Sequence, residues 1–235
     1  HRDLHSFPTR RSSDLRSCVE NGKLAPAFLL FQLGPVQEFI ECARSTQDCW
    51  SGSYILSWLM SKALSAVAME CGPDNVIFPA LRGQPFFDFT MKDVYSSIGL
   101  DSGKTLWDYV SVSIDKKLRI PNIPNRFLML VPQSKAKQLA ELAENAIRSE
   151  WHKISSEAWK IFCEDAGEDL SLWKERWADQ VENFLTIHWQ TMDWDMDLQD
   201  HELTAWALQI PEKERDPRYF DSSSGTPHLD RKSVV

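Results

Sequence analysis

The chain has 235 residues, of which 43% are hydrophobic, and it carries ten tryptophans and a formal net charge of −8. Its apolar content is ample for the packed core of one domain, whereas its acidic balance argues against a protein that binds nucleic acid through a large basic surface. No apolar run reaches the roughly 18 residues of a membrane helix, and five scattered cysteines are typical of a reduced, cytoplasmic protein.

The two ends of the chain do not read as natural protein. Residues 5–15, HSFPTRRSSDL, and residues 230–235, DRKSVV, can be encoded by two stretches of DNA, of which the second is the reverse complement of part of the first. The pair resembles a sequencing adapter read through at both ends of an assembled fragment, so residues 1–15 and 230–235 are set aside. Each of these ends carries a formal charge of +1, and the remaining chain therefore carries −10 against −8 for the whole. We expect the natural protein to continue on both sides of residues 16–229.

A strand and two helices are expected in the first third of the chain. Ala27–Leu33, AFLLFQL, is an apolar run of strand length that ends at Gly34-Pro35. Because Pro is favoured at the first helical position, a helix is predicted to start there with the apolar face Val36, Phe39, Ile40 and Ala43. The stretch Trp50-Ser51-Gly52-Ser53 is predicted to interrupt the helix, and a second helix to run from about residue 54 to 69.

The rest of the chain alternates between strands, helices and irregular segments. The long helix predicted over residues 135–163 has the apolar stripe Leu139, Leu142, Ala143, Ala146, Ile147 and Trp151. The other predictions are a strand at 75–79, a loop at 81–89, a short helix within irregular residues 90–125, at about 106–113, a strand at 126–131, a helix at 171–181, a strand at 184–190 and a helix starting within 200–208.

This order of elements predicts the fold class. Strand, two helices, strand, strand, two helices, strand is the pattern of an α+β, ferredoxin-like fold, with an antiparallel sheet, helices on one face and helical insertions. We expect one such domain over residues 16–210, followed by a linker or the start of another region over 211–229.

Three motifs resemble ligand-binding sites, but in each the details favour a structural role. Residues 99–105, GLDSGKT, have three residues between the glycines where a phosphate-binding loop has four, so a polar turn is preferred. The acidic run at Asp193, Asp195 and Asp197 lacks the glycine and glutamate of a calcium loop and suits a helix N-terminus. His152, His188 and His201 are isolated, which disfavours zinc; His188 is expected in the core or at a sheet edge.

The stretch 34–60, GPVQEFIECARSTQDCWSGSYILSWLM, supports two interpretations. A strand, a Gly-Pro turn and a helix start leave backbone N–H groups available to a phosphate. Gly52 permits the close approach of another backbone, and the serines beside it supply hydroxyl groups. The alternative is a purely structural turn followed by a helix break, in which Val36, Phe39, Ile40 and Trp50 are core residues.

The same stretch resembles the N-terminal palm-like region of the large subunit of type III-B CRISPR effector complexes, the Cas-ten family, Cmr branch. The family pattern is roughly GPVQ-x-FI-x-x-AR-x-T-x-D-x-W-x-GS-x-x-LS, and the chain keeps all of its specified positions between Gly34 and Ser57. Residues 76–88, VIFPALRGQPFFD, resemble the next segment of the family. Gln47 and Cys49 depart from it, since members usually carry a basic residue and a leucine there.

The resemblance implies a palm related to nucleotide cyclases and polymerases. In the family, nucleoside triphosphates, mainly ATP, bind between two palms, and a Gly-Gly-Asp-Asp turn on the second palm holds divalent metal, Mg or Mn, and makes cyclic oligoadenylates when target RNA binds. Many members also carry a His-Asp nuclease domain for single-stranded DNA. This chain contains neither a Gly-Gly-Asp-Asp nor a His-Asp motif, so no catalytic or metal-binding residue is nominated in it.

The resemblance also implies candidate nucleotide-binding residues and partners. The candidates are Gly34, Gln37, Arg44, Gly52, Ser53 and Tyr54. The expected partners are other CRISPR effector subunits and, through the complex, guide RNA and target RNA, with no membrane. Two rivals stay open: a non-catalytic scaffold module that packs against other effector subunits, and a stand-alone ferredoxin-like enzyme of unrelated chemistry. We also expect exposed apolar surface on the isolated chain.

Overall fold

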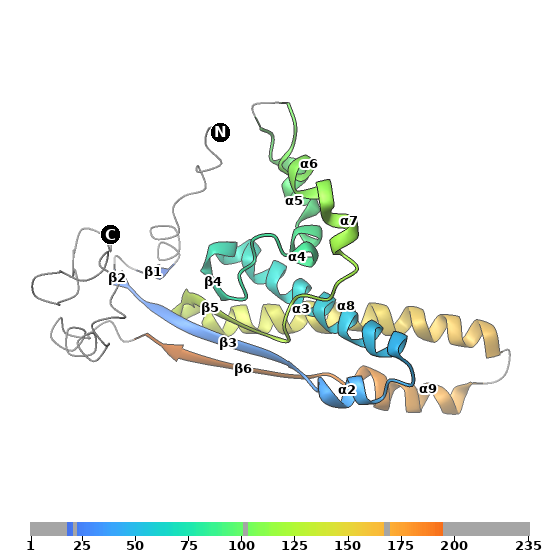
Figure 1. Cartoon of the computed structure of the whole chain (residues 1–235). Coiled ribbons are helices and arrows are strands. Elements are labelled where there is room, and N and C mark those ends of the chain that lie inside the picture. Colours follow the sequence, from blue (N-terminus) through green and yellow to red (C-terminus); the bar gives the residue numbers. More distant parts are fainter. Residues whose placement is uncertain (1–17, 21–22, 101–102, 167–169, 195–235) are drawn as a thin grey trace, which may run out of the picture.

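The computed structural model describes residues 18–20, 23–100, 103–166 and 170–194 (Figure 1). Several sequence predictions lie outside these residues. They are the adapter-like ends, Asp195, Asp197, His201, the helix within 200–208 and the segment 211–229. Within the described residues no helix is both long and apolar enough to cross a membrane.

A four-stranded antiparallel sheet organises the fold. Its spatial order is β4 (Val76–Phe78), β5 (Arg126–Pro132), β3 (Pro26–Gly34) and β6 (Thr186–Asp193). In chain order these are the second, third, first and fourth strands, which is the βαββαβ arrangement of a ferredoxin-like fold. The predicted α+β fold class is therefore confirmed. A two-stranded hairpin, β1 (Val19–Glu20) with β2 (Lys23–Leu24), precedes the sheet.

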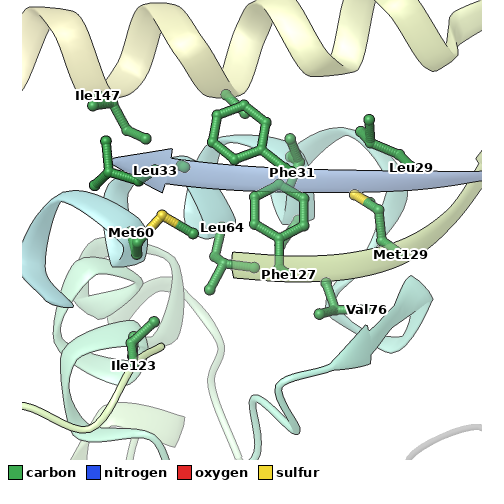
Figure 2. Packing of buried hydrophobic residues seen from close by; sticks show 14 of the residues in the cluster. Leu29, Phe31, Leu33, Met60, Leu64, Val76, Ile123, Phe127, Met129 and Ile147 are labelled. Carbon is green, nitrogen blue, oxygen red and sulfur yellow. The ribbon is translucent and has the colours of Figure 1, made fainter. Parts of the chain in front are cut away.

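Two long helices cover one face of the sheet. They are α3 (Thr46–Cys71) and α8 (Ala136–Ala166), which also pack against each other. Alternate residues of β3 point to this face, because successive side chains of a strand point to opposite sides. Ala27, Leu29, Phe31 and Leu33 are fully buried. Figure 2 shows Phe31 of β3 beside Phe127 of β5, whose rings stack with centroids 4.9 Å apart, and Ile147 of α8 above the strand.

Shorter helices lie in all three connections between the strands of this sheet. The one after β3 begins with α2 (Gln37–Glu41), and the one between β4 and β5 holds four short helices that lie beyond α3, away from β3 and β6 (Figure 1). After α8 the chain turns back along α9 (Ser171–Trp177) and a π-helical turn, Ala178–Glu182. The four helices between β4 and β5 are α4 (Pro85–Thr90), α5 (Lys92–Ser97), α6 (Leu106–Val110) and α7 (Ile114–Lys117).

The predicted stripe of the long helix is confirmed. Leu139, Ala143, Ile147 and Trp151 are buried, and Leu142 and Ala146 are half-buried. The indole N–H of Trp151 donates to the carbonyl of Val181 at 2.7 Å, which ties α8 to the returning chain. The apolar periodicity of a sequence therefore located this helix to within three residues at each end.

Two predictions about helices are wrong. The Trp50–Ser53 stretch does not break a helix, since α3 runs through it without interruption. The break lies earlier, at residues 42–45, and Pro35 precedes α2 rather than starting it. Residues 81–89 also do not form a loop throughout, because Pro85 occupies the first turn of α4, where its fixed φ suits a helix.

The polar turn predicted over residues 99–105 is confirmed at its described residues. Gly99 forms an antiparallel bridge with Thr105, and Thr105 then caps α6 in a capping box with Asp108. Hydrogen bonds from the backbone and side chain of Thr105 lower the pKa of Asp108. His188 is exposed on the edge strand β6, one of the two placements expected for it.

Candidate functional site

The candidate region is the corner where β3 leads into α2 and α3. Ser45 is the N-cap of α3, and its hydroxyl oxygen accepts a hydrogen bond from the N–H of Asp48 at 3.1 Å. A serine followed three residues later by an acidic residue is a helix-start signal. The chain therefore leaves the sheet at Gly34, makes one short helix, turns and starts a long helix, all within about a dozen residues.

Arg44 stands at the turn between α2 and α3. Its side chain is 92% exposed, and its Nε lies 3.7 Å from Oδ2 of Asp48. The same Asp48 oxygen accepts the backbone N–H of Arg44 at 3.2 Å. An exposed ion pair of this kind contributes roughly 1 kcal/mol or less. The guanidinium can therefore exchange Asp48 for another anion at little cost.

Gln37 and Gly34 flank the start of α2. Gln37 is exposed at the first position of α2, so its amide is available to a ligand. Gly34 ends β3 beside β6, and a Cβ on it would lie 3.0 Å from Oγ1 of Thr186. The close approach of β6 therefore explains why the residue at position 34 has no side chain.

Gly52 and Ser53 are occupied by the fold itself. Gly52 is buried inside α3, and a Cβ there would lie 3.2 Å from Cδ1 of Ile40. The close approach is made by side chains of α2 and not by another backbone, as the sequence had suggested. The Ser53 hydroxyl donates to the carbonyl of Cys49 at 3.1 Å, a bond to its own helix.

Tyr54 lies on a different side of α3 from Gly52, because residues two apart on a helix are separated by about 200°. Its ring meets Phe86 edge-on, with centroids 4.7 Å apart, and tilts against Trp50 at 5.2 Å. Of the four residues held to be core, Val36 and Phe39 pack against the core and Ile40 is half-buried under Gly52. The prediction that Trp50 is a core residue is wrong, because Trp50 is 46% exposed.

An apolar pocket that the sequence did not predict lies on the Tyr54 side of α3. It measures about 390 Å³. The side chain of Trp58 links it to α8, since its indole N–H donates to Oε1 of Glu150 at 2.8 Å, and the ammonium of Lys62 lies 4.6 Å from the Trp58 ring centroid. The lining is aromatic and aliphatic, which suits an apolar or aromatic group. The residues that line it are Tyr54, Ile55, Trp58, Phe89, Leu118 and Ile154.

One carboxyl group with a shifted pKa lies near this side of the molecule. Burial raises the pKa of Asp88 from 3.8 to about 6, against the opposing effects of a hydrogen bond with Tyr95 and the charge of Lys117. Burial and the neighbouring Asp88 together raise the pKa of Tyr95 to about 12. The pair joins α4 to α5, and Asp88 faces Tyr95 rather than a second carboxylate.

The exposed side chains of the corner carry groups of both charges. Gln37 and Arg44 offer an amide and a guanidinium to a phosphate, but Glu38 and Glu41 of α2 are exposed nearby and repel one. Among residues 18–194 as described, no group of three His, Cys, Asp or Glu side chains is placed to hold a metal ion.

The chain matches one family model and is similar to two curated proteins described here. Residues 28–156 match the family model described as CRISPR-associated protein Cmr2, N-terminal. The chain is 28% identical over 213 residues to the CRISPR system Cmr subunit Cmr2 of Pyrococcus furiosus, covering 83% of this chain and 22% of that protein. It is 31% identical over 108 residues to the corresponding subunit of Saccharolobus solfataricus, covering 41% of this chain and 10% of that protein.

A solved structure is also similar. It is a chain from a cryo-EM structure of the type III-B Cmr-beta complex bound to cognate target RNA, with a TM-score of 0.49 and 20% sequence identity. The match covers 72% of this chain and 19% of that one. The chain thus spans about a fifth of the length of the relatives that it matches over most of its own residues.

Proposed function

Because the chain belongs to the family of CRISPR-associated protein Cmr2, over that family's N-terminal region, we propose that it forms the palm-like, ATP-binding part of the large subunit of a type III-B CRISPR antiviral effector complex. The observation that carries this proposal is the family match over residues 28–156, which includes the whole corner from β3 to α3. We place the complex in the cytoplasm.

In this proposal, the intact subunit makes cyclic oligoadenylates when target RNA binds. ATP lies between this region and a second palm, whose Gly-Gly-Asp-Asp turn holds Mg or Mn. Metal-dependent phosphoryl transfer needs paired carboxylates to hold the ions. The corner described above offers donors without such a pair, which fits a nucleotide-binding half rather than a catalytic half. Other effector subunits are direct partners, and guide and target RNA are reached through them.

Within this site, exposed and buried candidates have different roles. We assign Gln37 and Arg44 to direct contact with the nucleotide, since both side chains are exposed and free to turn toward it. Gly34 and Gly52 shape the corner by letting Thr186 and Ile40 approach. Ser53 and Tyr54 hold the adjoining turns of α3 through the bond to Cys49 and the ring contact with Phe86.

A scaffold module is the second candidate function. The observation in its favour is the apolar pocket beside Tyr54 and Trp58, which has no charged group in its lining. Such a surface suits an apolar side chain from another effector subunit. In that case the corner at Arg44 has no ligand, and the chain acts by holding neighbouring subunits in place.

Titration of the isotope-labelled chain with ATP and Mg²⁺, followed by NMR, separates the two functions. Weak binding by a partial site still shifts amide signals in fast exchange, so ATP should shift signals from residues 34–48 and the Gln37 side chain. Arg44→Ala and Gln37→Ala should reduce the shifts. Arg82→Ala, which removes an exposed arginine outside residues 34–48, should not.

The outcome is decisive in both directions. Shifts at the corner that depend on Arg44 but not on Arg82 support the nucleotide-binding function. No shift at residues 34–48 up to tens of millimolar ATP contradicts it and leaves the scaffold function. In that case, loss of subunit association after Trp58→Ala or Phe89→Ala identifies the pocket as the docking point.

A further inference from the structure

The apolar pocket beside Tyr54 and Trp58 lies where four helical segments meet. Its walls come from α3, from α4, from the residue that follows α7, and from α8 (Figure 1). Five of its six lining side chains are half-buried, and the sixth, Phe89, is 38% exposed. Such a wall gains from losing its remaining contact with water when another apolar group enters. At about 390 Å³, the pocket has room for one large side chain.

One wall of the pocket continues into a row of aromatic rings. The ring of Phe89 contacts those of Trp58 and Trp107, with centroid distances of 6.0 Å and 6.4 Å. Trp107 belongs to α6 and is half-buried. The row Trp58, Phe89 and Trp107 therefore extends the apolar surface from the pocket onto the helices between β4 and β5.

A lysine ammonium group lies over the ring at each end of this row. Nζ of Lys62 is 4.6 Å from the ring centroid of Trp58, and Nζ of Lys92 is 5.6 Å from that of Trp107. Within the described part of the chain, neither lysine forms an ion pair. An aromatic ring attracts a cation without neutralising it. Both ammonium groups are therefore available to anions that lie beside the pocket.

Two carboxyl groups near the pocket are already engaged in hydrogen bonds. Oε1 of Glu150 accepts the indole N–H of Trp58 at 2.8 Å. Asp88 is hydrogen-bonded to Tyr95, and the charge of Lys117 acts on it as well. The carboxyl groups on this side of the molecule are therefore held by the chain's own donors and do not pair with Lys62 or Lys92.

The local charge differs in sign from that of the whole chain. On α8, exposed Lys153 and Glu157 flank Ile154 with opposite charges. Together with the groups named above, the surroundings of the pocket hold four lysines and three carboxyl groups, a small positive surplus in a chain of net charge −8. Charge complementarity therefore favours an acidic occupant.

The lining favours a protein segment over a nucleic acid as that occupant. Only Tyr54 and Trp58 bring a polar side-chain atom to the lining, and the indole N–H of Trp58 is already donated to Glu150. A nucleobase would bury polar edges with few partners, which is costly, whereas an aliphatic or phenyl side chain has no such edges. The negative charge of the whole chain also repels a polyanion.

We propose that the pocket takes one aliphatic or aromatic side chain from an acidic segment of a partner protein, whose carboxylates on either side pair with Lys62 and Lys92. The ring centroids of Trp58 and Trp107 are at most about 12 Å apart, a span that an extended segment crosses in about four residues. This inference rests on the scaffold function and names the chemistry of the partner. Tyr54 is the one residue that it shares with the candidate nucleotide site.

The test titrates the labelled full chain with short capped peptides and follows isoleucine methyl signals by NMR. Three peptides have a central leucine between glutamates, serines or lysines, and a fourth has a central alanine between glutamates. The signals of Ile55 and Ile154, which line the pocket, should shift most with the first peptide. The serine and alanine peptides should bind more weakly, and the lysine peptide should bind weakest. Ile77, at an exposed position of β4, should not respond.

Lysine variants test the proposed charge pairs. The double variant Lys62→Gln with Lys92→Gln should weaken binding of the glutamate–leucine peptide roughly fivefold, as expected for two exposed ion pairs. Lys104→Gln is the matched control, because Lys104 also lies over an aromatic ring, 5.7 Å from the centroid of Tyr109, but not over a ring of the row. It should leave the affinity unchanged.

The outcomes separate this inference from the functions proposed above. Shifts at Ile55 and Ile154 that follow the expected order and depend on Lys62 and Lys92 support it. Equal binding of the three leucine peptides overturns the acidic partner and leaves the scaffold function. No shift with any peptide overturns the inference and the pocket as a docking point, while the ATP titration at residues 34–48 is read independently. Stronger shifts with oligouridylate than with any peptide also overturn it, since they identify RNA as the occupant.

Discussion

Gly52 of α3 lies against Ile40 of α2, and a Cβ at Gly52 would come within 3.2 Å of the Cδ1 atom of Ile40. The absent side chain is thus what allows the short helix α2 to pack against the start of the long one. Phe39 takes part in the same contact, with ring atoms 3.6 Å from that Cβ position. A glycine within a helix, which usually weakens it, here sets the distance between two helices.

The size of the residue at position 52 should therefore control stability. We expect Gly52→Ala to be neutral within about 1 kcal/mol, because better helix propensity offsets the shift of the flexible end of Ile40. Gly52→Val should destabilise by roughly 1–3 kcal/mol through overpacking. Urea unfolding measures both. Met69→Val, at an exposed position of the same helix, controls for β-branching, and an equal loss there would contradict the packing explanation.

The hydrogen bond between Trp58 and Glu150 should stabilise the contact of α3 with α8. Its length is 2.8 Å and its acceptor is a partly buried carboxylate oxygen. Glu150→Ala should cost about 1–2 kcal/mol, whereas Glu150→Gln keeps an oxygen acceptor and should cost less. A double-mutant cycle with Trp58→Phe isolates the pair. Additive losses in the cycle would show that the bond contributes nothing of its own.

The sequence was sufficient to predict the antiparallel sheet and the fold class. Strands such as Arg126–Pro132 are short apolar runs bounded by polar residues or prolines, and α8 has a long 3.6-residue period. The predicted helix break at Gly52 is wrong because a glycine costs a helix only about 1 kcal/mol, and here the glycine also lets the side chains of α2 pack closely against α3. The true break carried its own signal, Ser45 with Asp48, which marks a helix start.

The candidate site was only partly predictable. Exposed residues that follow a strand, such as Gln37 and Arg44, can be identified from sequence because a turn places them at the surface. The apolar pocket cannot, since it joins Trp58 to Phe89 and Ile154, which are far apart in the chain and belong to three different helices. The helix that contributes Phe89 was itself predicted to be a loop.

Cys71 should resist alkylation far more than Cys42. Burial raises the pKa of the Cys71 thiol from 9.0 to about 11. A rise of two units leaves about 100-fold less of the reactive thiolate at pH 8. Cys42 is exposed and should react first. Timed iodoacetamide labelling with peptide mass spectrometry measures both rates, and Cys42→Ser confirms the peptide assignment. Similar rates at the two positions would contradict a raised pKa of the Cys71 thiol.

The carboxyl group of Asp88 should make stability fall between about pH 4 and pH 7. Its pKa is about 6 in the folded chain against an ordinary value of 3.8, so the folded state holds a proton that the unfolded state has lost. The favourable contribution is complete below pH 3.8 and disappears as the pH rises through 6. A shift of this size corresponds to about 3 kcal/mol, which partial exposure reduces to roughly 1–2 kcal/mol.

Asp88→Asn isolates this contribution because it keeps an oxygen that can accept from Tyr95 and cannot ionise. The free energy of unfolding of the variant minus that of the parent should therefore increase by roughly 1–2 kcal/mol from pH 4 to pH 7. Denaturant unfolding at several pH values measures the difference. Asp93→Asn, at an exposed position of α5, is the matched control. A difference for Asp88→Asn that stays constant across the range would mean that the pKa of Asp88 is the same in the folded and the unfolded chain.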